Sequence, residues 1–308
     1  MNLSRNRRKT RRRKGRSHYM VAGLRFTKMQ GIGNDYVYVN GFEERVDNPG
    51  ELAKRISDRH FGVGSDGLVL ILPSGVADLR MRMFNADGSE AEMCGNATRC
   101  VGKYAHDHGI VNKDVIRLET AAGIKIIRLL FEAGEVRGAT VDMGEPVLAP
   151  ERIPVLLAPA LTEGEDPQRF IARPVEVGGR TYAVTAVSMG NPHAVVFMQG
   201  IDDLDLPKLG PLFEHHSIFP KRTNTEFVEV ISSTKIRMRV WERGAGETLA
   251  CGTGACAAAV ASVLNGHTGR SLDVELKGGV LHIDWDKSDD HVYMTGGAVT
   301  VFDGVYFI

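Results

Sequence analysis

The chain has 308 residues, of which 43% are hydrophobic and 25% are charged, a balance typical of a globular protein of about two domains. No apolar run approaches the roughly 20 residues that a membrane-spanning helix needs, so the sequence excludes a transmembrane protein of that kind. Four cysteines are too few for a disulfide scaffold and favour a reducing, cytoplasmic environment.

The net charge is zero, but it is unevenly distributed. Nine of the 38 Lys and Arg lie within residues 1–18, which contain no acid, so the remainder carries 29 basic against 38 acidic residues, a charge near −9. The segment has no apolar region of a signal peptide, and we expect residues 1–19 to form a disordered basic tail. Two interpretations are a nucleic-acid-binding arm and a dispensable extension upstream of a start at Met20. The second is favoured, because no aromatic residues interleave the charges.

Past the tail, short strands separated by glycine-rich turns predominate, and helices are few. Helical periodicity predicts helices at residues 50–60, 95–108, 204–216 and 252–265. Alternation of polar and apolar residues predicts strands at residues 78–84 and 235–241. A hairpin is expected at Gly178-Gly179, and residues 156–173 read as an exposed loop.

A glycine motif lies between the first predicted helix and a predicted strand at residues 68–72. Residues 62–67, Gly-Val-Gly-Ser-Asp-Gly, match the dinucleotide-binding fingerprint G-x-G-x-x-G. That fingerprint runs from a strand into a helix, whereas here a helix precedes and a strand follows. We therefore interpret the motif as a turn.

The chain contains an internal repeat at an offset of 157 residues. Residues 79–84 (Leu-Arg-Met-Arg-Met-Phe) align without gaps with residues 236–241 (Ile-Arg-Met-Arg-Val-Trp). Farther along, residues 90–95 (Glu-x-x-x-Cys-Gly) align with residues 247–252. Six of the 17 positions from 79 to 95 are identical, where ordinary composition predicts about one. The repeat predicts two pseudo-symmetric domains with the functional site in the cleft between them.

Each copy places a cysteine directly before a predicted helix. Cys94-Gly95 opens one helix and Cys251-Gly252 opens the other. A helix N-terminus carries unpaired backbone N–H groups and the positive end of the helix dipole, which can lower a thiol pKa and hold a carboxylate. We therefore expect Cys94 and Cys251 to be reactive and to face one cleft from opposite sides.

The other two cysteines are interpreted differently. Cys100 and Cys256 lie within the predicted helices and have no counterpart in the other copy, so we expect them to be small buried hydrophobes. The cysteine spacings do not match structural zinc sites, and the Cys-x-x-Cys of dithiol redox sites is absent. The sequence predicts no metal site.

Two opposed thiols suit the inversion of a carbon stereocentre. Inversion needs a base on one face of the carbon and an acid on the other, and a thiolate and a thiol can exchange these roles. The α-carbon of an amino acid is a very weak acid. Its carbanion-like transition state therefore also needs donors at the carboxylate and a site that excludes water.

Five motifs extend this interpretation. They read Phe-Thr-Lys-Met-Gln-Gly-Ile-Gly-Asn-Asp at 26–35, Phe-Asn-Ala-Asp-Gly-Ser-Glu at 84–90, Met-Cys-Gly-Asn at 93–96, Met-Gly-Asn-Pro-His at 189–193 and Glu-Arg-Gly-Ala-Gly-Glu-Thr-Leu-Ala-Cys-Gly-Thr at 242–253. With them the chain resembles, from about Leu24 to its end, the diaminopimelate epimerases, cofactor-independent two-cysteine isomerases of lysine and peptidoglycan precursor biosynthesis.

The resemblance implies roles for individual residues in the interconversion of LL- and meso-diaminopimelate. Cys94 and Cys251 would be the acid–base pair, and His193 and Glu242 would bias their protonation states. The reacting α-carboxylate would be held by the backbone N–H groups of Gly95, Asn96, Gly252 and Thr253. The remainder of the substrate would be bound by Asn34, Asn85, Asn191, Asn224, Glu242 and Arg243, with Arg243 as the clamp for the far carboxylate.

The resemblance also implies an α/β fold of two similar domains, each a strongly curved mixed sheet wrapped around a central helix. We expect the first domain at residues 20–142 plus 297–308 and the second at residues 143–296, with the last strand returning to the first domain. The expected partners are the small-molecule substrate and a second copy in a homodimer. Neither a cofactor, a membrane nor a nucleic acid is expected.

One position departs from the family, and two alternatives stay open. Where some members carry Gln, this chain has Gly67, which we leave out of the site. The segment at residues 156–173 is also longer than the shortest form of this loop in the family. Proline-type racemases resemble the same scaffold, but the asparagines and Glu242-Arg243 favour a substrate with a second polar end. A nucleic-acid-binding protein that uses the basic tail is the other alternative, and the intact cysteine pair argues against it.

Overall fold

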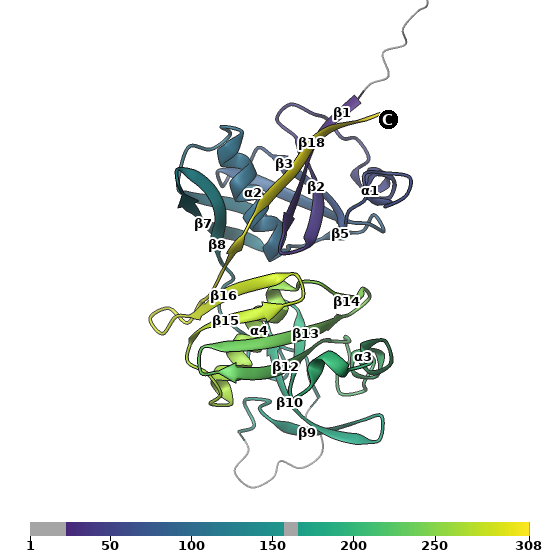
Figure 1. Cartoon of the computed structure of the whole chain (residues 1–308), viewed down its shortest axis with the longest axis vertical. Coiled ribbons are helices and arrows are strands. Elements are labelled where there is room, and N and C mark those ends of the chain that lie inside the picture. The colour runs from purple at the N-terminus through teal and green to yellow at the C-terminus, as the bar shows by residue number, and fades with distance from the viewer. Residues whose placement is uncertain (1–22, 157–165, 308) are drawn as a thin grey trace, which may run out of the picture.

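The computed structural model describes residues 23–156 and 166–307, which form two lobes stacked along the long axis of the molecule (Figure 1). The first lobe contains β1 (Gly23–Gly31), β2 (Asn34–Asn40), α1 (Pro49–Ser57), β3 (Gly67–Leu72), β4 (Leu79–Asn85), β5 (Glu90–Ala91), α2 (Gly95–Asp107), β6 (Val115–Thr120), β7 (Gly123–Glu132), β8 (Glu135–Asp142) and β18 (Val299–Phe307). The second contains β9 (Arg173–Val177), β10 (Arg180–Ser188), β11 (Pro192–Phe197), the short 3₁₀ turn η1 (Ile201–Asp203), α3 (Leu206–Glu214), β12 (Asn224–Ser232), β13 (Lys235–Glu242), β14 (Gly246–Thr248), α4 (Gly252–Leu264), β15 (Ser271–Leu276), β16 (Gly279–Trp285) and β17 (Val292–Gly297).

The repeat inferred from two short windows extends through the fold. Gly95 and Gly252, which open α2 and α4, are 157 residues apart, and so are Pro49 and Leu206, which open α1 and α3. Strand pairing is duplicated as well: β2 and β3 are parallel like β11 and β12, and β4 and β6 are parallel like β13 and β15. The expected pair of similar α/β domains is confirmed, whereas the residue boundaries given for them stay a prediction.

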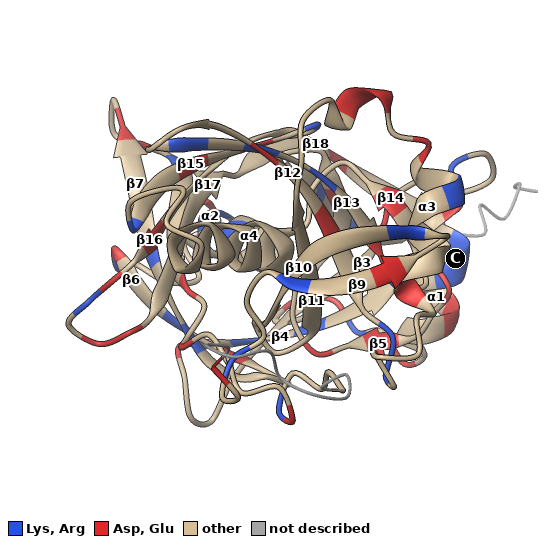
Figure 2. Cartoon of the chain, turned by 90° about the horizontal axis from the view of Figure 1, so that it is seen from below, with Lys and Arg blue, Asp and Glu red and all other residues tan. Residues whose placement is uncertain are grey.

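Each lobe wraps its sheet around one buried helix, as the view along the long axis shows (Figure 2). In the first lobe, Val101, Tyr104 and Ala105 of α2 pack among apolar side chains of the surrounding strands. In the second lobe, α4 is buried on nearly all sides, and its run of small residues at 255–261 lets the strands approach closely. The two helices therefore lie on the inside of the curved sheets, with their N-termini directed at the boundary between the lobes.

A strand pair joins the two lobes into one continuous sheet. β8 of the first lobe and β17 of the second pair antiparallel, from Asp142 opposite Tyr293 to Gly138 opposite Gly297. The chain then passes into β18, which crosses back and pairs along the whole of β1 (Figure 1). The expected return of the last strand to the first domain is confirmed.

Most predicted elements occur with small shifts at their ends. The first helix ends at Ser57 rather than at residue 60, and the third, predicted at residues 204–216, is α3, which is shorter at both ends and is preceded by η1. Gly178 and Gly179 form the expected hairpin between β9 and β10, both with positive φ. Residues 62–66 lie between α1 and β3, and Gly67 opens β3, so the motif is a turn that leads into a strand, as interpreted. The predicted tail, residues 1–19, and much of the predicted loop lie outside the described residues.

None of the helices that the structure describes is long and apolar enough to cross a membrane.

Gly67 is required by the packing around the start of β3. A Cβ at this position would lie 2.0 Å from the carbonyl oxygen of Phe84 and 2.7 Å from a ring carbon of Tyr36. We expect Gly67→Ala to lower the free energy of unfolding by about 2–3 kcal/mol, because backbone cannot yield as a flexible side chain does. Urea unfolding compared with Gly75→Ala, whose Cβ would meet nothing within 4 Å, measures this effect. Equal stability of the two variants would contradict the packing argument.

Candidate active site

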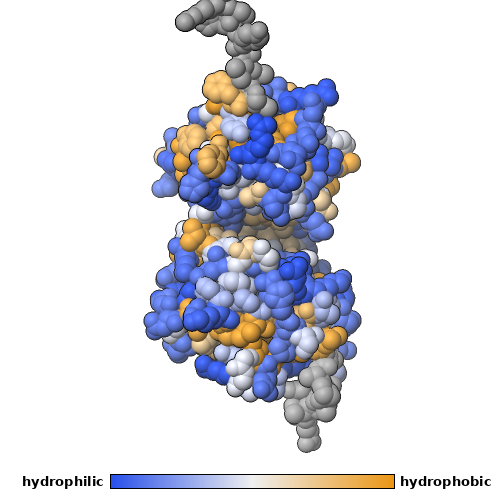
Figure 3. Space-filling view, turned by 90° about the vertical axis from the view of Figure 1, so that its right-hand side faces the viewer, coloured by the Kyte–Doolittle hydropathy of each residue, from blue (hydrophilic) through white to orange (hydrophobic). Residues whose placement is uncertain are grey.

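The molecular surface narrows to a waist where the two lobes meet (Figure 3). A cavity of about 500 Å³ is lined by residues from both lobes. The structure brings together there eleven of the thirteen residues predicted from the sequence: Asn34, Asn85, Cys94, Gly95, Asn96, Asn191, Glu242, Arg243, Cys251, Gly252 and Thr253. The remaining two, His193 and Asn224, do not line the cavity themselves. Each is hydrogen-bonded to a residue that does: His193 to Asn191, and Asn224 to Arg243.

Cys94 and Cys251 occupy equivalent positions at the boundary between the lobes. Each is the N-cap residue of its helix, with extended backbone, and each side chain borders the cavity. The two helix N-termini meet at Met294: a Cβ on Gly95 would lie 2.5 Å from its Cε, and one on Gly252 would lie 3.0 Å from its Sδ. One methionine side chain thus separates the starts of α2 and α4.

The two thiols have different partners. Cys94 Sγ donates a hydrogen bond to Asn34 Oδ1 at 3.3 Å, and Asn34 Nδ2 in turn donates to Asp66 at 2.8 Å. Cys251 Sγ accepts from the backbone N–H of Gly254 at 3.3 Å. All four cysteines are free, and Cys100 and Cys256 are fully buried as expected.

The direction of the thiol pKa shifts corrects the interpretation of the helix N-termini. Burial raises the pKa of Cys94, and the backbone N–H groups of Ala97 and Asn96 only partly counteract it. Burial raises the pKa of Cys251 well above its ordinary value, and the charges of Glu242 and Glu226 act in the same direction. Desolvation therefore outweighs the helix ends, and both thiols hold their protons at neutral pH.

Buried carboxyl groups lie on the Cys251 side of the cavity. Glu242 accepts a hydrogen bond from Thr248 Oγ1, and burial raises its pKa. His193 and Glu226 are both fully buried, with His193 Nδ1 2.7 Å from Glu226 Oε1, and burial also raises the pKa of Glu226. The other ring nitrogen, Nε2, lies 3.0 Å from Asn191 Oδ1. Both ring nitrogens of His193 therefore face oxygen atoms, one of Glu226 and one of Asn191.

Arg243 and Asn224 lie next to each other. Asn224 Oδ1 accepts a hydrogen bond from the backbone N–H of Arg243 at 2.9 Å, and Arg243 Nη1 donates to the carbonyl of Lys221 at 3.0 Å. Asn224 thus orients the segment that carries Arg243, while the Arg243 side chain itself borders the cavity.

Sequence reasoning missed residues that form or support this site. Tyr36 lines the cavity, Met294 separates the helix starts, and Glu226 pairs with His193. Glu226 had a usable signal, since it is a charged residue directly before the apolar Phe227-Val228 in a predominantly buried strand. Tyr36 and Met294 had none, because apolar and aromatic residues at strand positions are ordinarily core.

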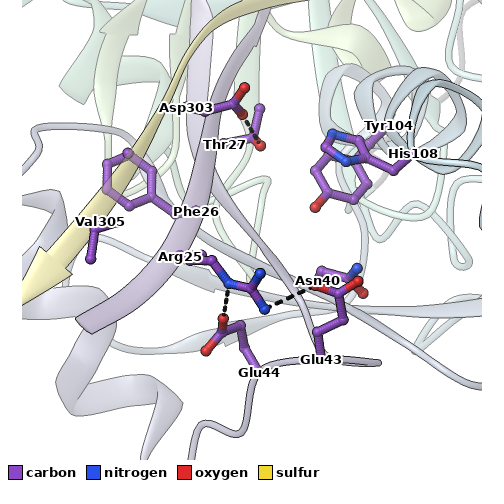
Figure 4. Close-up of a pocket in the computed structure, with 11 residues that line it drawn as sticks. Arg25, Phe26, Thr27, Asn40, Glu43, Glu44, Tyr104, His108, Asp303 and Val305 are labelled. Carbon is purple, nitrogen blue, oxygen red and sulfur yellow. Dashed lines mark hydrogen bonds and ion pairs between the residues drawn. The ribbon is translucent and has the colours of Figure 1, made fainter. Parts of the chain in front are cut away.

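A second cavity, of about 410 Å³, opens on the first lobe (Figure 4). Arg25 lies there between Glu43 and Glu44, Thr27 donates to Asp303, and Tyr104 stacks on His108. It contains no cysteine and none of the predicted site residues. The candidate active site is therefore the cavity between the lobes. Within the described part of the chain, no group of three or more His, Cys, Asp or Glu is placed to hold a metal ion.

Comparison with known proteins decides the family. The family model for diaminopimelate epimerase matches residues 26–149 and 185–301. The diaminopimelate epimerase of Desulfovibrio desulfuricans is 76% identical over 290 residues, which cover 94% of this chain and 100% of the relative. That of Acetivibrio thermocellus is 61% identical over 281 residues, covering 91% and 98%.

The chain belongs to the diaminopimelate epimerase family. It is an isomerase, as expected. Solved structures support the fold alone: a phenazine biosynthesis protein of the PhzF family from Bacillus anthracis matches with a TM-score of 0.65 at 16% identity, covering 93% of this chain and 100% of that one. A probable proline racemase from Agrobacterium radiobacter matches with a TM-score of 0.63 at 15% identity, covering 91% and 92%. The two-domain epimerase arrangement is thus confirmed, and the identity to the epimerases favours that family over the racemases.

Proposed function

We propose that this protein interconverts LL- and meso-diaminopimelate, with Cys94 and Cys251 exchanging the roles of base and acid at one α-carbon. The observation that carries the proposal is that both cysteines cap equivalent helices and border the same cavity. Because the two lobes are related by the repeat, a substrate held between the helix starts has one sulfur on each side. A thiolate removes the proton from one face, and the opposite thiol delivers a proton to the other.

The α-carboxylate would bind at the two helix N-termini. Gly95 and Asn96 open α2, Gly252 and Thr253 open α4, and all four line the cavity. Their backbone N–H groups and the positive ends of two helix dipoles favour the negative charge that builds up at the carboxylate as the α-proton leaves. Two helix ends aimed at one carboxylate offer more donors than the single end of an ordinary anion site.

The far end of the substrate would lie among amide side chains and one guanidinium. Asn34, Asn85 and Asn191 border the cavity with Arg243, while Asn224 orients the Arg243 segment. Arg243 can accept a second carboxylate in bidentate geometry. Such an end matches diaminopimelate, which carries an amino acid group at each end, and does not match proline.

The protonation states depend on the bound substrate. Burial favours the neutral form of both thiols, so one thiol releases its proton to solvent as the substrate binds, and the positive charge of the substrate's ammonium group stabilises the thiolate that results. Glu242 and His193 lie on the Cys251 side. They would exchange a proton with Cys251, or offset its change in charge, when Cys251 gains or loses its proton. Closure of the lobes around the substrate would exclude water from the carbanion-like transition state.

Incubation with LL-diaminopimelate in deuterated water tests the proposal. We expect meso-diaminopimelate to appear with solvent deuterium at the inverted carbon, while unreacted LL-isomer keeps its hydrogen early in the reaction. Transfer of the original hydrogen into the product would indicate one base and overturn the two-thiol mechanism. Turnover of proline but not diaminopimelate would favour the racemase alternative.

We also infer that the enzyme acts as a cytoplasmic homodimer. Apolar side chains of β18 are exposed on the first lobe: Val299, Val301, Phe302, Val305 and Phe307. Such a strip is typical of a surface that a second copy covers. Light scattering should give twice the mass of the chain, and Val301→Lys should lower it to one chain; a wild-type monomer would overturn the inference. Four free cysteines support a reducing compartment.

A further inference from the structure

Arg99 is a buried cation that the mechanism above does not use. Its side chain is fully buried, on the second turn of α2. Nε donates to the carbonyl of Gly297 at 3.2 Å, and Nη1 lies 3.5 Å from the carbonyl of Gly95 and 3.7 Å from Met294 Sδ. Nη2 has no hydrogen-bond partner, and no carboxylate lies within 4 Å of the guanidinium, among the described residues.

A fully buried guanidinium without an anion is costly, because desolvation of the charge is repaid only by a close negative partner. The groups around Arg99 that can become anions are Tyr38 and the thiols of Cys94, Cys100 and Cys256. Burial raises the pKa of Cys100 to about 11 and of Cys256 to about 12, and raises that of Tyr38 well above its ordinary value. These three stay neutral in the working range of pH.

Cys94 is the remaining candidate, and its position differs from theirs. It borders the cavity, and the guanidinium reaches back along α2 to the carbonyl of Gly95, the residue next to it. The charged groups acting on Cys94 are Arg99, which favours the thiolate, and Glu242, which opposes it. Those acting on Cys251 are Glu242 and Glu226, both of which oppose a thiolate. The two halves of the site therefore have the same backbone arrangement, but a buried cation acts on Cys94 whereas the charged groups that act on Cys251 are carboxylates.

We propose that Arg99 is a positioning residue that stabilises the Cys94 thiolate, so that Cys94 rather than Cys251 is the first of the two thiols to lose its proton. The catalytic consequence rests on the proposed function: as the substrate binds, Cys94 becomes the base more readily than Cys251, which favours reaction of the isomer whose α-hydrogen faces Cys94. The guanidinium supplies the positive charge from beneath the helix start, where it does not compete with the substrate for space. The pseudo-symmetric position in α4 is Cys256, so the second lobe has no equivalent cation.

Alkylation with iodoacetamide as a function of pH tests this without substrate. Mass spectrometry of the separate peptides reports Cys94 and Cys251 independently. In the wild-type enzyme we expect the midpoint for Cys94 to lie below that for Cys251. In Arg99→Met, which keeps an unbranched apolar side chain and removes the charge, the Cys94 midpoint should rise by about one pH unit, while that of Cys251 should not move. Arg99→Lys should retain most of the wild-type difference.

Three outcomes would overturn the proposal. These are a Cys251 midpoint at or below that of Cys94 in the wild-type enzyme, an unchanged Cys94 midpoint in folded Arg99→Met, and equal shifts at both cysteines. The first needs no variant, so the proposal stays testable even where Arg99→Met does not fold. Labelling requires no turnover. A labelling result that contradicts the role of Arg99 can therefore be distinguished from an absence of epimerase activity. In kinetics, Arg99→Met should lower kcat at least tenfold with a smaller change in KM, and Arg99→Lys should recover part of it.

Discussion

Replacing either Cys94 or Cys251 with alanine is expected to lower kcat/KM for epimerisation by at least about 1,000-fold. Each variant keeps the helix N-terminus and the carboxylate site but lacks one of the two proton-transfer groups, each of which contributes on the order of 100- to 10,000-fold. Inversion requires both faces of the carbon, so neither remaining thiol can complete the reaction alone. The rate is followed in both directions from the ratio of LL- to meso-isomer.

The two variants should differ in hydrogen exchange. A single thiol can remove the α-hydrogen from the face that it borders and return solvent deuterium to that face without inversion. We therefore expect each variant to exchange the hydrogen of one isomer only, and the two variants to choose opposite isomers. Cys256→Ala, a buried cysteine of α4 outside the cavity, is the matched control and should retain activity. Substantial epimerisation by either active-site variant would contradict the mechanism.

Arg243→Met is expected to raise KM for diaminopimelate by about 100-fold with a smaller effect on kcat. The guanidinium would bind the carboxylate far from the reacting carbon, and loss of a charge-assisted, bidentate pair in a partly enclosed site weakens binding by this order. Initial rates at varied substrate concentration separate KM from kcat. Arg80→Met, on the surface with only a 3.7 Å contact to Glu119, is the matched control and should leave KM unchanged.

A truncated substrate makes this prediction specific. Lysine is diaminopimelate without one carboxylate, so the wild-type enzyme should process it poorly for the same reason that Arg243→Met processes diaminopimelate poorly. The two losses should not add: with lysine, wild type and Arg243→Met should be nearly equal. A full additional loss with lysine would place Arg243 elsewhere than at the far carboxylate.

Much of the fold could be predicted because the chain is duplicated. A match of six positions in 17 located the two helix starts, and the cysteines at 94 and 251 came with them. The capping geometry at both positions follows from that duplication, whereas the other predicted residues around the cavity, such as Asn34 and Arg243, came from the family resemblance. The amphipathic pattern of α2 and the run of small apolar residues in α4 predicted these two helices. The predicted helix ends at residues 60 and 204 were displaced.

The electrostatics of the site could not be predicted from the chain order. Helix N-termini lower a thiol pKa in isolation, but the outcome at Cys94 and Cys251 depends on how far the sulfur atoms are desolvated, which is a property of the packed structure. Glu226 is brought beside His193 by the pairing of β11 with β12, which the spacing of the residues does not indicate. Arg99 lies four residues after Gly95 on the same helix, so helix geometry places it near Cys94, whereas its complete burial without a carboxylate partner is a property of the packed structure.

The pairing of β8 with β17 makes the two halves inseparable despite their separate cores. Cutting the chain between the copies would leave β8 and β17 as unprotected sheet edges, and would also take β18 away from β1. Either fragment expressed alone should aggregate through its unpaired edge strand instead of folding as a stable single domain. An ancestral single copy would have faced the same difficulty, and pairing two identical copies edge to edge would have solved it before the genes fused.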